Sequence, residues 1–357
     1  MDYNITYRKK DKGIQVIISY KVNGKWKQKS KQGFKKKNDA KRAADKLLDD
    51  LKCNIENSLN TDYGNITFKD FTIMFLEHEI LYKEPGTIRS YRFALNRFKE
   101  LNDLELTKIN TMQIQTCVDN MIKTGLASST TKLYVSKLNT IFSNAIKPYN
   151  LIAKNPVDGI KILKSKKQEK IKALDKAKLK DLLGKITYKK YYIASLIAAT
   201  CGLRIGEVLG LTWADIDEIN STLTVNKQWK KLKSGNWGFG SVKSKNSNRV
   251  VPISPNTLKE LKNFKKNFVT DIHNRIIVCA DSINLSRGLR DCYKRNGYNI
   301  SIHDLRHTYA TMLIGNGVDF KTAAKLLGHT IEMTMKTYAH VNDDMINKAT
   351  NLIEKIF

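Results

Sequence analysis

The sequence is poor in cysteine and in acidic side chains, and it contains no long apolar run. Its five cysteines stand singly, without a CxxC pair or the spacing of metal ligands, so neither a disulfide framework nor a zinc site is expected. No run approaches the roughly eighteen apolar residues of a membrane helix, and the opening residues MDYNITYRKK lack the apolar block of a secretory signal. We therefore expect a cytoplasmic protein with no membrane association.

Basic side chains, by contrast, are in large excess. Sixty-three Lys and Arg against thirty-four Asp and Glu give a formal net charge of +29, and residues 1–50 alone hold fifteen basic and six acidic side chains. A charge of this size predicts a polyanionic partner. A membrane surface would call for a concentrated basic amphipathic helix, which the sequence does not show. Nucleic acid is therefore the predicted partner, with binding that weakens as the salt concentration rises.

The length of the chain predicts several domains, since 357 residues are too many for one ordinary core. Changes of pattern along the chain divide it into four segments. The predicted segments are a small α+β module at 1–56, an all-α domain at 65–158, a basic linker at 159–173 and a mainly α domain with a small β-sheet at 174–357.

The N-terminal module shows the pattern of a β-hairpin, because Asn23-Gly24 separates two alternating runs. We expect a three-stranded sheet with one helix packed on one face. The predicted strands lie near 4–8, 13–22 and 25–31, and the helix runs from an N-cap at Asn38 to about Cys53. The uncovered face is expected to carry Lys and aromatic side chains that contact DNA, including Trp26 and Lys27, although a core position for Trp26 fits the sequence equally well.

The second domain begins at the capping box Thr67-x-x-Asp70. Pro85-Gly86 is expected to stop this first helix, and three more helices are predicted: TIRSYRFALNRFKEL, residues 110–123, and a helix after Ser128. Their outer faces are basic, which is typical of a clamp over one side of a DNA duplex, while a plain solvated bundle is the alternative. The predicted DNA-binding residues of this domain are Arg89, Arg92, Arg97 and Lys132.

The third domain is expected to open with helices at 176–185 and 189–201. Gly202 ends the second of these, and Arg204 then precedes Glu207 by three positions. Taken alone, this pair predicts only an i,i+3 surface ion pair. A strand is predicted at 222–228.

A hairpin-like stretch rich in Gly, Ser and Lys follows that strand. It places Lys243 or Lys245 on a β-turn just before the strand RVVPIS, so that one of the two lysines reaches into a site. Further helices are predicted at 255–269, 285–296, 302–315 and 342–356.

Residues 301–340 gather the groups needed to attack a phosphodiester. His303 and Arg306 lie three positions apart and share one helical face, while His307 is expected to point away from that face and to be structural. His329 adds an acid-base or hydrogen-bonding group, and Tyr338 adds a phenol that could act as a nucleophile. Each residue alone is unremarkable, but their order and spacing predict a site.

These residues form an ordered pattern that resembles the tyrosine recombinase family, also called the phage integrase family. The segments GLRIGEVLGL, HDLRHTYAT and LLGHTIEMTMKTYAH are similar to its two sequence boxes, and the basic N-terminal module resembles the arm-binding domains of phage and transposon integrases. The resemblance implies an arm-type DNA-binding domain, a helical core-binding domain and a catalytic domain of the tyrosine recombinase fold.

The resemblance also implies a reaction and its residues. Tyr338 would attack the scissile phosphate and form a 3′-phosphotyrosine, with Arg204 and Arg306 holding the non-bridging oxygens. The general acid would be Lys245, which fits the family pattern better than Lys243. His303 would assist proton transfer at the nucleophile, His329 would hydrogen-bond the phosphate, and Glu207 would support the site. Neither a metal ion nor ATP is implied.

The family further implies an integrase of a mobile element that acts on double-stranded DNA as a homotetramer. The apolar face of the segment NDDMINKATNLIEKIF would dock on a neighbouring subunit, with packing on its own domain as the alternative. An excisionase or a DNA-bending host protein would be a further partner. Two other functions remain open at this point: a non-catalytic DNA-binding protein on the same fold, and an enzyme like the type IB topoisomerases.

Overall fold

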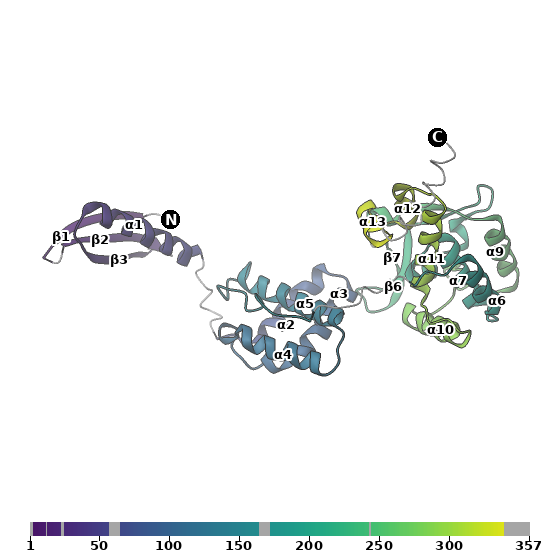
Figure 1. Cartoon of the computed structure of the whole chain (residues 1–357), viewed down its shortest axis with the longest axis horizontal. Coiled ribbons are helices and arrows are strands. Elements are labelled where there is room, and N and C mark those ends of the chain that lie inside the picture. The colour runs from purple at the N-terminus through teal and green to yellow at the C-terminus, as the bar shows by residue number, and fades with distance from the viewer. Residues whose placement is uncertain are drawn as a thin grey trace, which may run out of the picture. The chain divides into compact units, whose positions relative to one another are not determined.

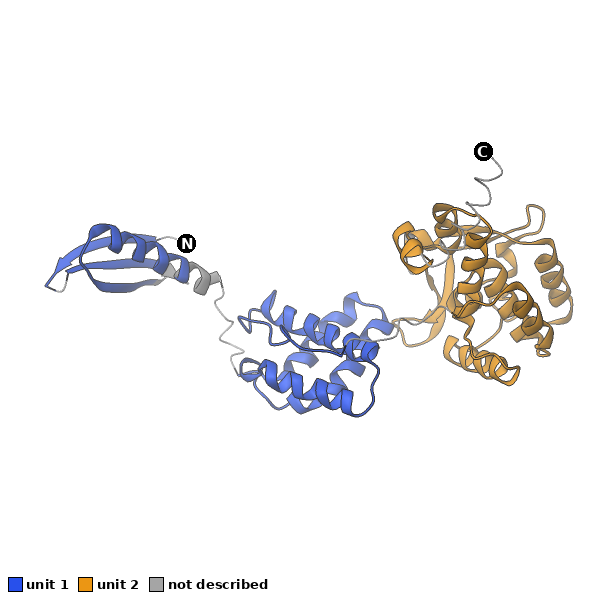
Figure 2. Cartoon of the chain, in the orientation of Figure 1, with its two compact units in different colours: residues 1–166 blue, residues 167–357 orange. Residues whose placement is uncertain are grey.

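The computed structural model describes residues 3–11, 13–22, 25–56, 65–163, 172–242 and 244–338. Contacts between residues divide the chain into two compact units, 1–166 and 167–357 (Figure 2). The division falls inside the predicted linker of 159–173. The predicted C-terminal helix at 342–356 and the turn at Asn23-Gly24 lie outside the described residues.

The N-terminal module is an antiparallel sheet covered by one helix (Figure 1). Its elements are β1 (Tyr3–Lys10), β2 (Gly13–Val22), β3 (Lys25–Phe34) and α1 (Lys37–Glu56). Val16 and Ile18 of β2 pack against Ala40, Ala44 and Leu48 of α1 in a core of their own. The predicted sheet and helix are confirmed, but α1 begins at Lys37, so Asn38 lies in its first turn instead of capping it.

The two sides of strand β3 carry different side chains. On β2, Val16 and Ile18 point toward α1, so Ser19 points to the opposite face. Gln28 pairs with Ser19 and shares that face. Trp26, two residues before Gln28, therefore also lies on the face that α1 leaves uncovered. Its side chain is 59% exposed, which excludes a core position. Lys27 pairs with Tyr20, which packs against the core, so Lys27 lies on the face of the sheet that α1 covers. The uncovered face is thus less rich in lysine than predicted.

The helical domain has its own core, built around Phe68, Phe71, Phe98 and Phe142. Its elements are α2 (Phe68–Tyr82), α3 (Pro85–Leu95), η2 (Asn96–Leu101), η3 (Leu106–Lys108), α4 (Thr111–Lys123) and α5 (Ser128–Ile146). The predicted N-cap at Thr67 is confirmed, because its Oγ1 accepts a hydrogen bond from the backbone N–H of Asp70 at 3.2 Å. The hydroxyl of Thr67 in turn donates to the carboxylate of Asp70 at 2.7 Å. The structure differs at Pro85, which occupies the first turn of α3, where proline is well tolerated, and α2 ends earlier at Tyr82.

The predicted DNA-binding side chains of this domain all lie on its surface. The guanidinium of Arg89 stacks over the ring of Phe93 at 5.2 Å from its centroid. Arg92, Arg97 and Lys132 are exposed as well. These cations are accessible to a ligand, and their contact with DNA stays a prediction.

The first residues of the predicted linker belong to the helical domain. The side chain of Gln115 on α4 donates to the carbonyl oxygen of Lys161 at 3.1 Å and accepts from its backbone N–H at 2.9 Å. Ile160 and Ile162 pack on the phenylalanine core. At the C-terminal end of the predicted linker, the backbone N–H of Leu174 donates to the hydroxyl of Thr308, in the second unit, at 3.0 Å. The linker is therefore shorter than predicted, and residues 164–171 lie outside the described part of the chain.

The second unit is mainly helical with two small sheets. Its helices are α6 (Lys176–Lys185), α7 (Lys189–Cys201), α8 (Ile205–Gly210), η4 (Trp213–Asp215), η5 (Lys245–Ser247), α9 (Pro255–Asn267), α10 (Ser282–Arg295), α11 (Ile302–Gly315), α12 (Phe320–Leu327) and α13 (Ile331–Tyr338). Its strands are β4 (Ile216–Asp217), β5 (Thr222–Val225) and β8 (Arg249–Pro252) in one sheet, and β6 (Lys227–Lys231) and β7 (Trp237–Ser241) in a hairpin. The strand predicted at 222–228 is thus two strands, in different sheets.

Helix α7 lies at the centre of this unit (Figure 1). Its side chains from Ile193 to Ala199 and Cys201 are buried, so the helix is apolar on nearly all sides. It packs against α9 and α11, and its buried residues join the core of the unit. A helix that is apolar all round must be covered on every side. Its C-terminus therefore holds the following residues, Gly202 to Arg204, at a fixed place in the interior.

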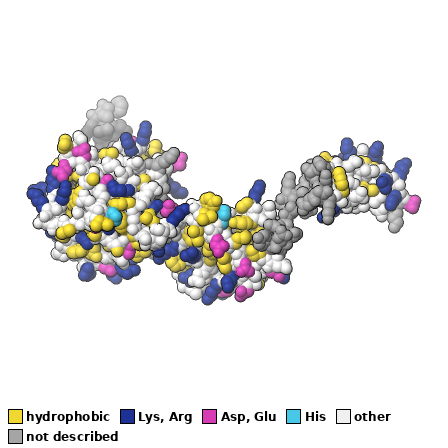
Figure 3. Space-filling model, turned by 180° about the vertical axis from the view of Figure 1, so that it is seen from behind, with side chains coloured by type: hydrophobic (Ala, Val, Ile, Leu, Met, Phe, Trp, Pro, Cys, Tyr) yellow, Lys and Arg dark blue, Asp and Glu magenta, His cyan; other side chains and the backbone are white. Residues whose placement is uncertain are grey.

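The basic side chains are spread over the surface. Lys and Arg appear on each part of the chain in Figure 3, with acidic side chains between them. Within the described ranges, no group of His, Cys, Asp and Glu has the arrangement of a metal site. None of the helices described is long and apolar enough to cross a membrane.

Candidate active site

The first part of the site is a network of charged side chains around Glu207. Arg204 immediately precedes α8, and Glu207 lies in the first turn of that helix. The carboxylate accepts hydrogen bonds from Nη1 of Arg204 at 2.7 Å and from Nη2 of Arg249 on β8 at 2.9 Å. The side chains of Glu207 and Arg249 are only 3% and 2% exposed. Arg204 and Glu207 therefore belong to a buried network and not to a surface ion pair.

This network keeps Glu207 ionised. Burial is the largest influence and raises the pKa of its carboxyl group, but the charges and hydrogen bonds of Arg249 and Arg204 outweigh it, so the net pKa lies below the usual value. The resulting carboxylate neutralises part of the positive charge of the arginines around it.

Two arginines converge on neighbouring peptide groups. Arg306 on α11 is 1% exposed, and its guanidinium donates to the carbonyl oxygens of Gly202 and Leu327. Arg204 donates to the next carbonyl along the chain, that of Gly328, at 3.2 Å. The segments that precede α8 and follow α12 are thereby joined to α11 at one place.

The charge of Arg306 survives this burial. Burial, followed by the nearby charge of Arg204, lowers the pKa of Arg306 to about 9, which leaves the guanidinium protonated at neutral pH. A second positive charge therefore lies within the site, next to Arg204.

Two glycines allow this close approach. Gly202 and Gly328 end helices α7 and α12 with φ of +67° and +63°, the left-handed conformation that favours glycine. A side chain at position 328 would place its Cβ 2.9 Å from the Cα of Ser247, and one at position 202 would overlap the ring of Tyr309. Neither position can take a side chain without moving the residues that frame the arginines.

The hydrogen bond from Arg306 fixes the tautomer of His329. Nη2 of Arg306 lies 2.8 Å from Nε2 of His329. Because a guanidinium has no acceptor, Nε2 is the bare nitrogen and Nδ1 carries the proton of the neutral ring. Burial and the charges of Arg306 and Arg204 lower the pKa of His329 to about 3. Nδ1 is buried and has no hydrogen-bond partner among the described residues, so it is an available N–H donor.

The hydroxyl of Tyr338 is bound by His307. Tyr338 ends α13 with no exposed surface, and its hydroxyl lies 2.7 Å from Nδ1 of His307 on α11. The prediction that His307 points away from the site is therefore wrong. The ring of His303, one helical turn earlier, packs edge-on against His307 with their centroids 4.6 Å apart. His303 itself lies on the surface, and burial of part of its ring, with the charge of Arg306, lowers its pKa.

The predicted turn is present at Lys245, because the backbone N–H of Ser247 donates to the carbonyl oxygen of Ser244 at 3.0 Å. It does not close a hairpin, since β7 and β8 lie in different sheets, and it forms the short helix η5. This turn adjoins the site, because Nη1 of Arg204 donates to Oγ of Ser247 at 3.5 Å. Lys243 and the side chain of Lys245 lie outside the described residues, and the choice between them stays a prediction.

Arg249 joins three segments around the site, and no sequence motif marks it. It donates from Nε to the carbonyl oxygen of Leu326 at 2.7 Å and from Nη1 to that of Ser247 at 3.0 Å, in addition to its bond with Glu207. It therefore holds together the lysine turn, the end of α12 and the Glu207 carboxylate. Alternation along β8 predicts an inward position for it, but only the tertiary structure supplies its partners.

Replacing Arg249 is expected to destabilise the second unit strongly. Arg249→Ala removes one partner of a buried ion pair and leaves two carbonyls without their donor, which should cost about 3–5 kcal/mol. Urea unfolding followed by tryptophan fluorescence measures this loss, because three of the four tryptophans lie in this unit. The control, Arg295→Ala at the exposed end of α10, should change the unfolding free energy by less than about 0.5 kcal/mol. Equal midpoints for the two variants would contradict the structural role of Arg249.

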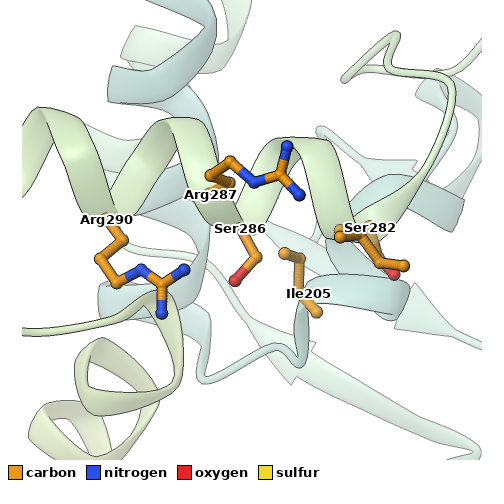
Figure 4. Close-up of a pocket in the computed structure, with 6 residues that line it drawn as sticks. Ile205, Ser282, Ser286, Arg287 and Arg290 are labelled. Carbon is orange, nitrogen blue, oxygen red and sulfur yellow. The ribbon is translucent and has the colours of Figure 1, made fainter.

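A cavity of about 350 Å³ lies next to the site, between α10 and the start of α8. Ile205, the residue after Arg204, forms one wall, and Ser282, Ser286, Arg287 and Arg290 of α10 line the other (Figure 4). Both arginines are exposed. Neither arginine belongs to a sequence motif, so neither was predictable as part of a site.

Comparison with known proteins places this architecture in a family. The model of the phage integrase family matches residues 169–345, and that of the arm DNA-binding domain matches residues 5–51. A tyrosine recombinase XerC-like protein of Caldanaerobacter subterraneus subsp. tengcongensis is 28% identical over 96% of each chain. The ICEBs1 integrase of Bacillus subtilis is 25% identical over 82% of this chain and 83% of its own. Residues 169–345 of the chain belong to the phage integrase family, the tyrosine recombinases, and residues 5–51 are an arm DNA-binding domain.

Solved structures show the same fold. The integrase of transposon Tn1549, in complex with transposon right end DNA, matches 81% of this chain and 100% of its own with a TM-score of 0.67 and 21% identity. A lambda integrase dimer bound to a core site matches 93% and 94% of the two chains with a TM-score of 0.61 and 18% identity. The predicted fold class is therefore confirmed: an α+β module, a helical domain and a mainly α domain with small sheets.

Proposed function

We propose that this protein is a site-specific DNA recombinase that integrates and excises a mobile element. The observation that carries the proposal is the convergence of Arg204, Arg306 and His329 in one unit of a tyrosine recombinase chain. In the same unit, Tyr338 contacts His307, the residue after Arg306. These residues supply positive charge, a neutral N–H donor and a phenol, which are the groups that cleavage of a phosphodiester by a side chain requires.

In the proposed reaction the oxygen of Tyr338 attacks the scissile phosphate and forms a 3′-phosphotyrosine, and the 5′ oxygen leaves. Arg204 is 27% exposed and has guanidinium N–H groups beyond those bound to Glu207, Ser247 and Gly328, so it is suited to hold a non-bridging oxygen. The Nδ1–H of His329 is suited to donate to the same phosphate. Lys245, on the turn that adjoins Arg204, would protonate the leaving oxygen.

Double-stranded DNA is the proposed substrate. The net charge of +29 and the accessible cations of the helical domain favour a backbone-directed contact, and Trp26 offers an exposed ring on the N-terminal sheet. In the second unit, Arg287 and Arg290 line the cavity beside Ile205 (Figure 4). These two arginines are suited to bind phosphates next to the scissile one.

Assembly into a tetramer through the C-terminal helix is part of the proposal. A lambda integrase tetramer bound to a Holliday junction matches 91% of this chain with a TM-score of 0.58. Its relatives include the ICEBs1 integrase and the transposase from transposon Tn916 of Enterococcus faecalis. These relatives support the integrase of a mobile element over a topoisomerase or a non-catalytic DNA-binding protein. An excisionase or DNA-bending host protein would add direction, and the protein would act in the cytoplasm, on the nucleoid.

The proposed chemistry needs neither a metal ion nor ATP, and this is testable. The protein incubated with a nicked suicide duplex should form a covalent protein–DNA adduct with the same yield in EDTA as in Mg²⁺, because Arg204 and Arg306 supply the positive charge that a metal supplies elsewhere. Denaturing gel electrophoresis measures the adduct, and mass spectrometry of the tryptic peptide locates the linkage. A magnesium-dependent nuclease, inactive in the same EDTA, is the control. Loss of the adduct on chelation and its return with Mg²⁺ would contradict metal independence.

A further inference from the structure

The phenol of Tyr338 has one described hydrogen-bond partner, and that partner is His307. The Oη–Nδ1 distance is 2.7 Å, and the two rings lie 5.8 Å apart between centroids. The tyrosine ring is fixed by apolar packing in a cluster with Tyr309, Ile314 and Leu327. The hydroxyl is therefore held at one place, with an imidazole nitrogen directed at it.

The direction of this hydrogen bond depends on the charge states of the two groups and on the tautomer of His307. Burial, His303 and Arg306 together lower the pKa of His307 to about 4, whereas burial raises the pKa of Tyr338 to about 12 although Arg306 acts in the opposite sense. At neutral pH the imidazole is uncharged and the phenol is protonated. A phenol O–H is a stronger donor than an imidazole N–H, and an imidazole nitrogen is a stronger acceptor than a phenol oxygen. The Nε2–H tautomer of His307 is therefore favoured, in which Tyr338 O–H donates to the bare Nδ1.

The other side chains of the site are less suited to accept this proton. Nε2 of His329 is already occupied by the N–H of Arg306, and its Nδ1 carries a proton. The guanidiniums of Arg204 and Arg306 have no acceptor atom. His303 contacts the ring of His307 and has no hydrogen bond with Tyr338 among the described residues.

We propose that His307 is the general base that takes the proton of Tyr338 during strand cleavage, a role that rests on the proposed function. As the bond between the Tyr338 oxygen and phosphorus forms, the bond between phosphorus and the 5′ oxygen breaks. The phenolic proton moves to Nδ1 of His307, and the 5′ oxygen takes a proton from the general acid. When the strands rejoin, the imidazolium returns its proton to the tyrosine oxygen.

The transfer is coupled to bond formation, because between the resting groups it is strongly uphill. The phenolic proton becomes acidic as its oxygen gives electron density to phosphorus, so a base in contact acts in the transition state. The negative charge of the arriving phosphodiester raises the pKa of His307 and favours the same transfer. A weak resting base is thereby strengthened only when substrate is present.

The test compares two leaving groups. A suicide duplex with an ordinary scissile phosphate needs an acid at the 5′ oxygen, whereas one with a 5′-bridging sulfur does not, because a thiolate leaves without a proton. His307→Asn keeps an acceptor atom near the place of Nδ1 but cannot take a proton. We expect it to slow single-turnover cleavage by about 10²–10⁴-fold on both duplexes. Lys245→Ala, the matched control, should be slow on the first duplex and restored on the second.

Each outcome decides the proposal. If His307→Asn cleaves the ordinary duplex within tenfold of the wild-type rate, holding the Tyr338 hydroxyl in place is sufficient. This result would overturn the proposal that His307 is a general base. If the 5′-bridging sulfur duplex restores the cleavage rate of His307→Asn, His307 protonates the leaving 5′ oxygen. This result would also overturn the proposal that His307 is the base. If His307→Asn does not bind DNA like the wild type, His307→Gln takes its place. Failure of the wild-type chain to form any adduct would instead refute the proposed function.

Discussion

Tyr338→Phe is expected to abolish the covalent protein–DNA adduct while leaving DNA binding nearly unchanged. The substitution removes the oxygen that would bond to phosphorus, and no neighbouring group can replace it. The ring remains packed in its buried cluster, so the fold should lose only the hydrogen bond to His307, about 1 kcal/mol. Adduct formation is measured on a nicked suicide duplex, and affinity by gel shift, where a change below about twofold is expected because phosphate contacts elsewhere dominate binding.

The chain offers a matched control for this variant. Tyr309 lies in the same apolar cluster and is also nearly buried. Tyr309→Phe makes the same chemical change a short distance away and should form the adduct like the wild type. An adduct that survives in the Tyr338 variant, or that disappears equally in both variants, would refute Tyr338 as the nucleophile.

The site as it stands is closed around its own nucleophile. Tyr338 has no exposed surface and Arg306 has 1%, whereas Arg204 is 27% exposed. A phosphate can approach Arg204 from solvent, but attack requires the phenol to become accessible. Tyr338 is the last residue of α13, and in this closed arrangement its hydroxyl lies 2.7 Å from Nδ1 of His307.

The sequence predicted helix bounds well where a capping residue or a terminal glycine marked the end of the helix. Helices α6 and α7 have the predicted bounds, because Asp175 caps the first and Gly202 ends the second in a left-handed conformation. Pro85 misled the prediction, because proline both terminates helices and begins them, and only packing decides between the two.

The site residues were predictable as a set, but their contacts were not. Order and spacing singled out Arg204, Arg306 and Tyr338 without showing that Arg306 and Tyr338 are buried. The position of His307 was within reach, since it lies four residues after His303 and therefore shares its helical face. Its bond to Tyr338 depends on helices α12 and α13, which the sequence analysis did not predict. Interactions between distant segments carry no local pattern.

Arg204→Ala is expected to reduce strand cleavage by about 10³–10⁵-fold, as for an arginine that stabilises charge at a transferring phosphoryl group. The fold should persist, because Glu207 keeps its buried bond with Arg249 at 2.9 Å. Binding should change little, since Arg204 makes one phosphate contact among many. Single-turnover cleavage and gel shift on the same duplex separate the two effects.

The opposite pattern is expected for a cation outside the site. Arg92→Ala on the exposed face of α3 should weaken binding and reduce its salt dependence, while cleavage of saturated DNA stays near the wild-type rate. Arg204→Lys should cleave almost as slowly as Arg204→Ala. Lysine restores the charge but lacks the planar guanidinium, which can bind Glu207 and a phosphate oxygen at the same time. Losses of binding and cleavage in equal measure for Arg204→Ala would mean that this arginine serves the fold through Glu207, and that the charge at the phosphate comes from elsewhere.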